Sequence, residues 1–239
     1  MFTQDKQEEI SVNLAQLERE GENYRGSAWG KTKMDRVFSF LKQFIPFDTG
    51  NHTVLDLGCG GMTLAKELEK VPSFNVIGVD LVTDLLIRLS KKRTPGIPLT
   101  AGDAELLPYK RDSFDLIVHN QVLHHFFIRE LVLSEIKRVL KPGGILLSIE
   151  TNGWNPYVYY WHHSKRSKQK NFIGDNENPF GLLKFKKELK MADMDILGTK
   201  MINFDFIKPL SPFDPMFGKI PIFDLIFGGS MVVCSKKSD

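Results

Sequence analysis

Residues 54–68 read VLDLGCGGMTLAKEL and carry a strong structural signal. An apolar run contains an acid, Asp56, the glycines at 58, 60 and 61 follow, and a helical pattern begins after them. Glycines permit a tight turn whose backbone a ligand can approach, and a helix N-terminus offers free N–H groups. The stretch therefore predicts a strand, a ligand-binding turn and a helix. Folds that bind nothing there share this pattern, so that alternative stays open.

Short β-branched runs alternate with helical patterns beyond this stretch. We expect strands at 53–57, 75–80, 97–103, 114–120 and 143–150. The alternation indicates parallel strands joined by crossover helices. KPGG at 141–144 is expected to end the third helix in a reversal of the chain. Later, we expect a helix near 182–193, a strand near 199–207 and a final strand SMVVCSKK.

Composition is ordinary for a globular protein, with 239 residues, 42% hydrophobic, 26% charged, and a net charge of +3. This charge is too small to demand nucleic acid or an anionic membrane as partner. Cys59 and Cys234 form no disulfide framework and no metal-site spacing. The first residues lack a signal-peptide pattern, and no apolar run has the roughly 18 residues of a membrane helix. We expect a soluble, cytoplasmic protein.

A second acid makes the ligand more specific. Asp80 ends the run NVIGVD, 24 residues after Asp56. In a doubly wound sheet, a carboxylate at this place lies beside the glycine turn and accepts both hydroxyls of a ribose. The spacing favours an adenosine-containing ligand. A nicotinamide dinucleotide fits less well, because Thr63 stands where its G-x-G-x-x-G pattern has the last glycine.

Four ordered motifs then resemble a known superfamily: VLDLGCG, the acid of VIGVD, GDAELLPYKRDSFDLIVHNQVLHHF and EIKRVLKPGG. They resemble class I S-adenosylmethionine-dependent methyltransferases, closest to the small-molecule group that includes quinone-biosynthesis enzymes. The resemblance covers about residues 50–150 and the final strand. It implies a doubly wound α/β fold with a seven-stranded, mostly parallel sheet and an antiparallel last strand. It also implies S-adenosylmethionine as cofactor and S-adenosylhomocysteine as product.

We expect residues 1–239 to form one domain of this kind. Within it we expect an N-terminal helical lid over 1–47 and a cofactor-binding core over 48–150. A substrate-side insertion over 151–181 and a C-terminal helix with strands over 182–239 complete the expected organisation.

The resemblance also assigns site residues. It places the turn at residues 56–61 against the methionine part of the cofactor and Asp80 on the ribose. It places Asp103 on the adenine and the end of the fourth strand, at Asn120, near the sulfur. Tyr24 and Trp29 stand where related proteins fold an N-terminal segment over the cofactor, and core packing is the equal alternative. The remaining residues are Asp56, Gly58, Cys59, Gly60 and Gly61 in the turn, Asp80 and Leu81, Asp103 and Ala104, and Asn120 and Gln121.

One position departs from the family pattern. Met62 occupies the place of the third glycine of G-x-G-x-G, and Gly61 sits one position early. The Met62 side chain either narrows the pocket or packs beneath it, and both alternatives stay open.

Methyl transfer from a sulfonium is an in-line displacement, so alignment is the main task and a base is optional. His124 and His125 follow the fourth expected strand and are candidate bases, with packing around the cofactor as the alternative. His119 is expected to be a core residue. We expect no metal, because the adjacent Asp-Asn pair of metal-assisted relatives is missing.

Two aromatic regions bear on the methyl acceptor. Residues 154–161 hold five aromatic residues, and 202–229 is rich in phenylalanine and proline. Both suit a flat or apolar acceptor or a peripheral membrane contact, although core packing uses the same residues. We expect an enzyme acting on a small, aromatic or lipid-like molecule rather than on nucleic acid. A non-catalytic cofactor-binding protein or partner subunit is the alternative, and the oligomeric state stays open.

Overall fold

The computed structural model describes residues 6, 7, 10–12, 14, 15, 31–91, 96–163, 178–202, 225, 226 and 228–238. Its helices are α2 (Lys31–Leu41), α3 (Thr63–Glu69), α4 (Thr83–Lys91), the 3-10 helix η2 (Leu123–His125), α5 (Arg129–Val139), α6 (Pro156–His163) and α8 (Leu182–Met191). Its strands are β1 (His52–Leu57), β2 (Phe74–Asp80), β3 (Leu99–Ala101), β4 (Phe114–Asn120), β5 (Leu140–Thr151), β6 (Met194–Ile202) and β7 (Ser230–Lys237).

The seven strands form one sheet in the order β3-β2-β1-β4-β5-β7-β6. Strands β1 to β5 run parallel, whereas β7 pairs antiparallel with both β5 and β6. The strand order therefore confirms the predicted fold class. The chain goes outward to β3 on one side of β1 and then crosses to β4 on the other. In such sheets this switch point is where ligands bind, at the carboxyl ends of the strands.

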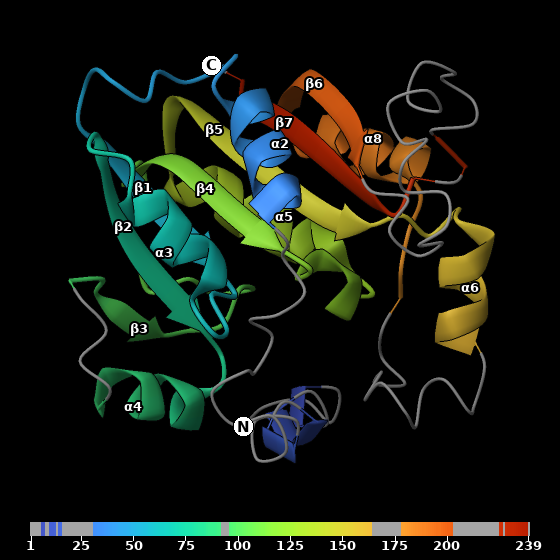
Figure 1. Cartoon of the computed structure of the whole chain (residues 1–239), viewed down its shortest axis with the longest axis horizontal. Helices are drawn as coiled ribbons and strands as arrows, with labels where there is room; N and C mark the ends of the chain where they lie inside the picture. The colour runs from blue at the N-terminus through green and yellow to red at the C-terminus, as the bar shows by residue number, and fades with distance from the viewer. Residues whose placement is uncertain are drawn as a thin grey trace.

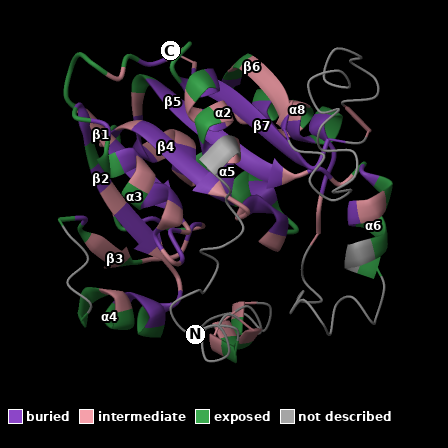
Figure 2. Cartoon of the chain, in the orientation of Figure 1, coloured by how far each residue is buried: buried purple, intermediate pink, exposed green. Residues whose placement is uncertain are grey.

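Helices cover both faces of the sheet (Figure 1). Alternate strand residues point to opposite faces, so Val54 packs into one core beneath α2 and α3, and Leu55 packs into the other beneath α5 and α8. The central strands are buried on both faces, while the outer surfaces of the helices are exposed (Figure 2). Burial on both sides explains why the central strands are continuous apolar runs in the sequence.

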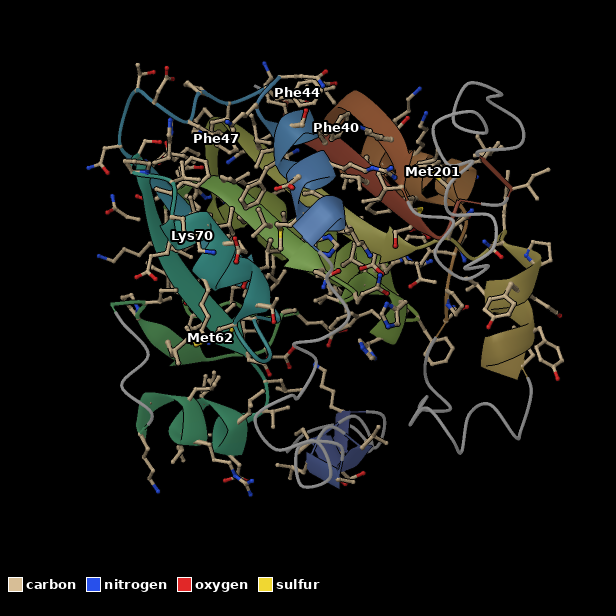
Figure 3. All side chains as sticks on the ribbon, viewed as in Figure 1. Phe40, Phe44, Phe47, Met62, Lys70 and Met201 are labelled. Carbon is tan, nitrogen blue, oxygen red and sulfur yellow. The ribbon has the colours of Figure 1, made fainter. Side chains whose placement is uncertain are left out.

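Helix α2 lies over the C-terminal part of the sheet. A Cβ atom at Gly198 of β6 would come within 2.8 Å of the Phe44 ring and 3.2 Å of the Phe40 ring. These two rings pack edge to face with centroids 5.2 Å apart (Figure 3). The glycine thus lets the aromatic residues at the end of α2 rest directly on the edge strand.

One expectation is wrong. The sixth strand begins at Met194 rather than near 199. It is an edge strand, and a register shift between Ile196 and Gly198 interrupts the alternation of apolar and polar residues in its first half. The expected end of the third helix at KPGG is confirmed: α5 ends at Val139, and the chain then turns into β5, which is parallel to β4, through a register shift with Gly143 at φ +71°.

Within the part of the chain that the structure describes, no helix is long and apolar enough to cross a bilayer.

Candidate cofactor site

A pocket lies at the carboxyl ends of β1, β2 and β4. It contains about 600 Å³ of empty space, part of which is open to solvent. Eight of the predicted site residues line it: Gly58, Gly60, Asp80, Leu81, Asp103, Ala104, Gln121 and His125. The other lining residues are Lys6, Leu57, Val79, Gly102, Val122 and Phe126. The structure thus brings together side chains that are more than a hundred positions apart in the sequence.

Asp80 connects the second strand to the glycine turn. Its Oδ2 atom accepts a hydrogen bond from the Gly60 N–H at 2.8 Å, and Oδ1 accepts one from the Val82 N–H at 2.9 Å. A carboxylate that receives one N–H on each oxygen still has lone pairs for further donors. The predicted ribose acid therefore lies in the pocket and also fixes the shape of the turn.

The glycines of the turn have different reasons to be glycine. Gly58 has φ +67°, and a Cβ atom there would come within 2.5 Å of the Val122 side chain. Gly60 has φ +47°, and its nearest neighbour among the described residues would be the Gly58 oxygen at 3.9 Å. Gly58 therefore admits the loop that follows β4, whereas Gly60 leaves open the side from which a ligand can approach.

Several other predicted residues lie behind the pocket lining. Asp56 and Cys59 are buried, and Asp56 Oδ2 finds no hydrogen-bond partner among the described residues. The pKa of Asp56 is raised to about 8. Burial raises this pKa most, the hydrogen bond from the Ala65 backbone N–H lowers it, and the charge of nearby Asp80 raises it. Asn120 Oδ1 is likewise buried without a partner in the described part of the chain. Gly61 does not line the pocket either.

Met62 packs beneath the turn. Its side chain is fully buried in the core under α3, and it is not among the residues that line the pocket (labelled in Figure 3). Its backbone adopts φ +62° at the N-terminal cap of α3, a left-handed conformation that suits glycine. The departure from the family pattern is therefore accommodated by backbone strain and leaves the pocket unobstructed.

The acid assigned to the adenine already has partners. Asp103 Oδ1 accepts from the Glu105 N–H, and the Lys6 ammonium group lies 2.5 Å from Asp103 Oδ2 and also contacts the Glu105 carboxylate. Nearby, Ile10 and Leu14 pack against a small apolar cluster of Val82 and Leu85. The N-terminal helical residues thus lie beside α4 and the end of β2 (Figure 1). No sequence pattern pointed to Lys6, which is one of many charged residues near the N-terminus.

Tyr24 and Trp29, the two aromatic residues assigned to a segment over the cofactor, lie outside the described residues. Their assignment stays a prediction.

The histidines separate into two groups. His125 lines the pocket. His119 is fully buried, as expected, with Nε2 2.8 Å from the Ser148 hydroxyl. His124 is also buried and does not line the pocket; its Nδ1 lies 2.8 Å from Glu150 Oε2. Of the two candidate bases, His125 is therefore the one placed to meet a ligand.

Glu150 is a site residue that sequence reasoning missed. It is fully buried at the end of β5, where it contacts the loop that forms one side of the pocket. Its signal was present in the sequence, because an acid closes the apolar run GGILLSIE much as Asp80 closes NVIGVD. Among the described residues, no three His, Cys, Asp or Glu side chains gather in a way that suits a metal ion.

Comparison with protein families matches residues 55–148 to a model described as a methyltransferase domain. The match runs from the first strand to the fifth and includes the glycine turn and Asp80. Residues 55–148 are therefore similar to a methyltransferase domain. For the methyltransferase domain, the resemblance seen in the four motifs is thereby confirmed.

Individual relatives agree at the level of the domain. A demethylmenaquinone methyltransferase of Streptomyces avermitilis is 36% identical over 106 residues, covering 44% of this chain and 45% of the relative. A human protein named mitochondrial arginine-hydroxylase NDUFAF5 is 30% identical over 124 residues, covering 52% of this chain and 34% of the relative. The chain thus spans half or less of the length of the curated relatives it matches.

A solved structure shows the same fold. Phosphoethanolamine N-methyltransferase 2 of Haemonchus contortus, in complex with S-adenosyl-L-methionine, has a TM-score of 0.64 at 18% identity, over 96% of this chain and 57% of that one. Methyltransferases of this fold use S-adenosylmethionine. The pocket of the methyltransferase domain fits such a ligand, because it combines an open approach at Gly60 with the carboxylates of Asp80 and Asp103 near two strand ends.

Proposed function

We propose that the chain is an S-adenosylmethionine-dependent methyltransferase that acts on a small, aromatic or lipid-like molecule. The observation that carries the proposal is the convergence of Asp80, Asp103 and the open side of Gly60 on one pocket at the switch point of the sheet. We extend the proposal to a single domain over residues 1–239 in the cytoplasm.

S-adenosylmethionine, when bound, supplies a methyl group on a positively charged sulfur. Asp80 would bind the ribose, and Asp103 with Ala104 would border the adenine. Gly60 would bring bare backbone against the ligand, and Gln121 would border its methionine end. Holding reactants in line removes much of the entropic cost of a two-molecule reaction, so this positioning is the main contribution of the protein.

His125 is the residue we propose as general base if the acceptor must lose a proton. It lines the pocket, while the neighbouring His124 is buried against Glu150. An imidazole titrates near neutral pH, which suits proton transfer from an acidic oxygen or carbon.

Two observations support an aromatic or lipid-like acceptor. Phe126 lines the pocket beside His125, and Trp154, Tyr159 and Tyr160 are exposed on and just before α6. Exposed aromatic faces with polar tips are suited to flat, partly apolar molecules. The Streptomyces relative is named for a quinone-type substrate, which agrees with this class of acceptor.

Titration calorimetry with S-adenosylhomocysteine tests the cofactor assignment. We expect the wild-type protein to bind, and Asp80→Asn to weaken binding by roughly 1–3 kcal/mol through the loss of a charged acceptor. Asp84→Asn, which removes an exposed acid of α4, is the matched control and should bind like the wild type. Absence of binding by the wild-type protein would reject the proposal.

Incubation with methyl-labelled S-adenosylmethionine and a panel of phenols, quinols and lipids tests the transfer itself. Label in an organic product is the expected result. A protein that binds the cofactor but transfers label to none of these classes would favour the non-catalytic alternative. Met62, which departs from the family pattern, packs below the pocket and so gives that alternative no support.

A further inference from the structure

A fully buried carboxylate, Glu150, organises the loop after β4. Its Oε1 atom accepts hydrogen bonds from the N–H groups of Val122 at 2.9 Å and Leu123 at 2.7 Å. Its Oε2 atom lies 2.8 Å from His124 Nδ1, and Nδ1 of His119 lies 3.3 Å from Oε1. Because an ionised carboxylate only accepts hydrogen bonds, His124 Nδ1 carries a proton.

The charge of Glu150 is retained in spite of burial. Burial alone would raise its pKa, but the neighbouring imidazoles of His124 and His119 outweigh burial and hold the pKa well below its usual range. A buried charge is tolerated only when hydrogen bonds and opposite charge compensate it. Two backbone N–H groups and two imidazoles provide that compensation here.

The loop that Glu150 holds forms one wall of the pocket. Gln121, Val122, His125 and Phe126 all line the pocket. Val122 reaches across to the glycine turn, where it takes the space that a Cβ atom at Gly58 would need. The wall and the turn therefore fit together only while the loop keeps its position.

The loop begins in a conformation that needs support. Gln121 has φ +60°, which non-glycine residues adopt only at some cost. Its N–H donates to the Ile149 carbonyl, and the Thr151 hydroxyl donates to its side-chain oxygen at 2.5 Å. Ile149, Glu150 and Thr151 are consecutive at the end of β5, so this strand end fixes the loop through three successive residues.

We propose that Glu150 is a positioning residue of the methyltransferase site, whose buried carboxylate holds the wall formed by residues 121–126 against the glycine turn and so sets cofactor affinity. This inference rests on the proposed function. Glu150 touches no ligand in it and acts through the loop. The hydrogen-bond acceptor at Oε1 is the essential feature, and the charge is secondary.

Two substitutions separate the acceptor from the charge. Glu150→Gln keeps an oxygen for the N–H groups of Val122 and Leu123 and removes the charge, and His124 without a proton on Nδ1 can accept a hydrogen bond from the new amide. Glu150→Ala removes the acceptor. Val233→Ala, at a buried position of β7 that pairs with Ser148 and forms no hydrogen bond with the loop through its side chain, is the control for a general loss of stability.

The experiment combines amide hydrogen exchange with titration of S-adenosylhomocysteine, below the melting temperature of every variant. We expect the Val122 and Leu123 amides to be protected in the wild type, in Glu150→Gln and in Val233→Ala, and to exchange rapidly in Glu150→Ala. We expect binding to weaken about tenfold or more in Glu150→Ala and less than about threefold in Glu150→Gln.

Equal weakening in Glu150→Ala and Val233→Ala would overturn the inference, and so would equal weakening in both Glu150 variants. If Glu150→Ala fails to fold, the wild-type protein alone still tests the inference. Rapid exchange of its Val122 and Leu123 amides would overturn the inference. Failure of the proposed function is distinguishable, because the wild-type protein would then bind no S-adenosylhomocysteine while the two amides kept their protection.

Discussion

Asp56 shows how far burial changes a single residue. The residue is 2% exposed, and its pKa is about 8 in the fold against an ordinary value of 3.8. Between these values the unfolded chain releases a proton that the folded protein keeps. The unfolded state then binds fewer protons, so stability contributed by this group falls as pH rises from about 4 to about 8.

Replacing Asp56 by Asn should remove this dependence. We expect Asp56 to lower the wild-type free energy of unfolding by roughly 1 kcal/mol for each pH unit over that range, and Asp56→Asn to lack this part of the slope. Urea unfolding near pH 5 and near pH 7 measures it. Asp84→Asn, an exposed acid, should keep the wild-type slope, and identical slopes for all three proteins would contradict a neutral Asp56.

Met62 joins two opposing effects at one position. Its backbone has φ +62°, which favours glycine by roughly 1 kcal/mol, and its side chain fills buried space. We expect Met62→Ala and Met62→Gly both to lose stability, by about 2–5 kcal/mol for the alanine variant. The glycine variant should be the more stable of the two by about 1 kcal/mol, although it removes more atoms. Thermal unfolding of both variants checks the order, and the reverse order would show that strain at this position is negligible.

The sequence predicted those pocket residues whose role follows from where they end a strand. Asp80 and Asp103 stand at strand ends, and the glycines stand between a strand and a helix, so their meeting follows from the topology. Glu150 had the same kind of signal. Lys6 had none, because its role depends on where the N-terminal residues dock, and local pattern does not determine that.

At the scale of elements, the N-terminal helical residues contact the cofactor side of the sheet through one cation. Burial alone would lower the pKa of Lys6, but hydrogen bonds and charge from Asp103 and Glu105 raise it. The side chains of this cluster are 14% to 26% exposed, so water screens the attraction only in part. The cluster therefore ties the N-terminal residues to the acid assigned to the adenine.

Lys6→Gln should loosen that tie. We expect faster amide exchange in residues 10–15, because the ion pairs of Lys6 with Asp103 and Glu105 are lost. Lys70→Gln is the matched control, since it removes an exposed pair with Glu67 that should contribute little. Hydrogen exchange read by mass spectrometry measures the effect. Unchanged exchange in Lys6→Gln would mean that the apolar contacts hold the segment by themselves.

Elements were predictable where their surroundings are uniform. The strands that are buried on both faces are apolar runs in the sequence, and their predicted bounds differ from the observed bounds by a few residues. Strand β6 lies at an edge and has a register shift between Ile196 and Gly198, so its pairing with β7 rather than its local sequence determines where it begins. Such pairing depends on tertiary structure.

For the whole molecule, the number of strands and the antiparallel last strand followed from the resemblance. The course of residues 203–224 lies outside the described part of the chain. Two separate cores arise because each central strand presents alternate residues to opposite helix layers. A continuous apolar run in the sequence does not show which of its residues belong to which core.

The two cysteine thiols are buried in different parts of the structure, so different local motions must expose them to solvent. Cys59 lies beneath the glycine turn, and Cys234 lies in β7 between β5 and β6; burial raises the pKa of both, for Cys234 to about 12. Each sulfur can meet an alkylating reagent only while its surroundings are open. Timed alkylation read by peptide mass spectrometry thus measures the opening rates of the glycine turn and of the sheet separately. We expect Cys59 to be modified faster than Cys234, and S-adenosylhomocysteine to slow the modification of Cys59 more than that of Cys234. Equal rates of modification would mean that the glycine turn opens only when the whole sheet opens.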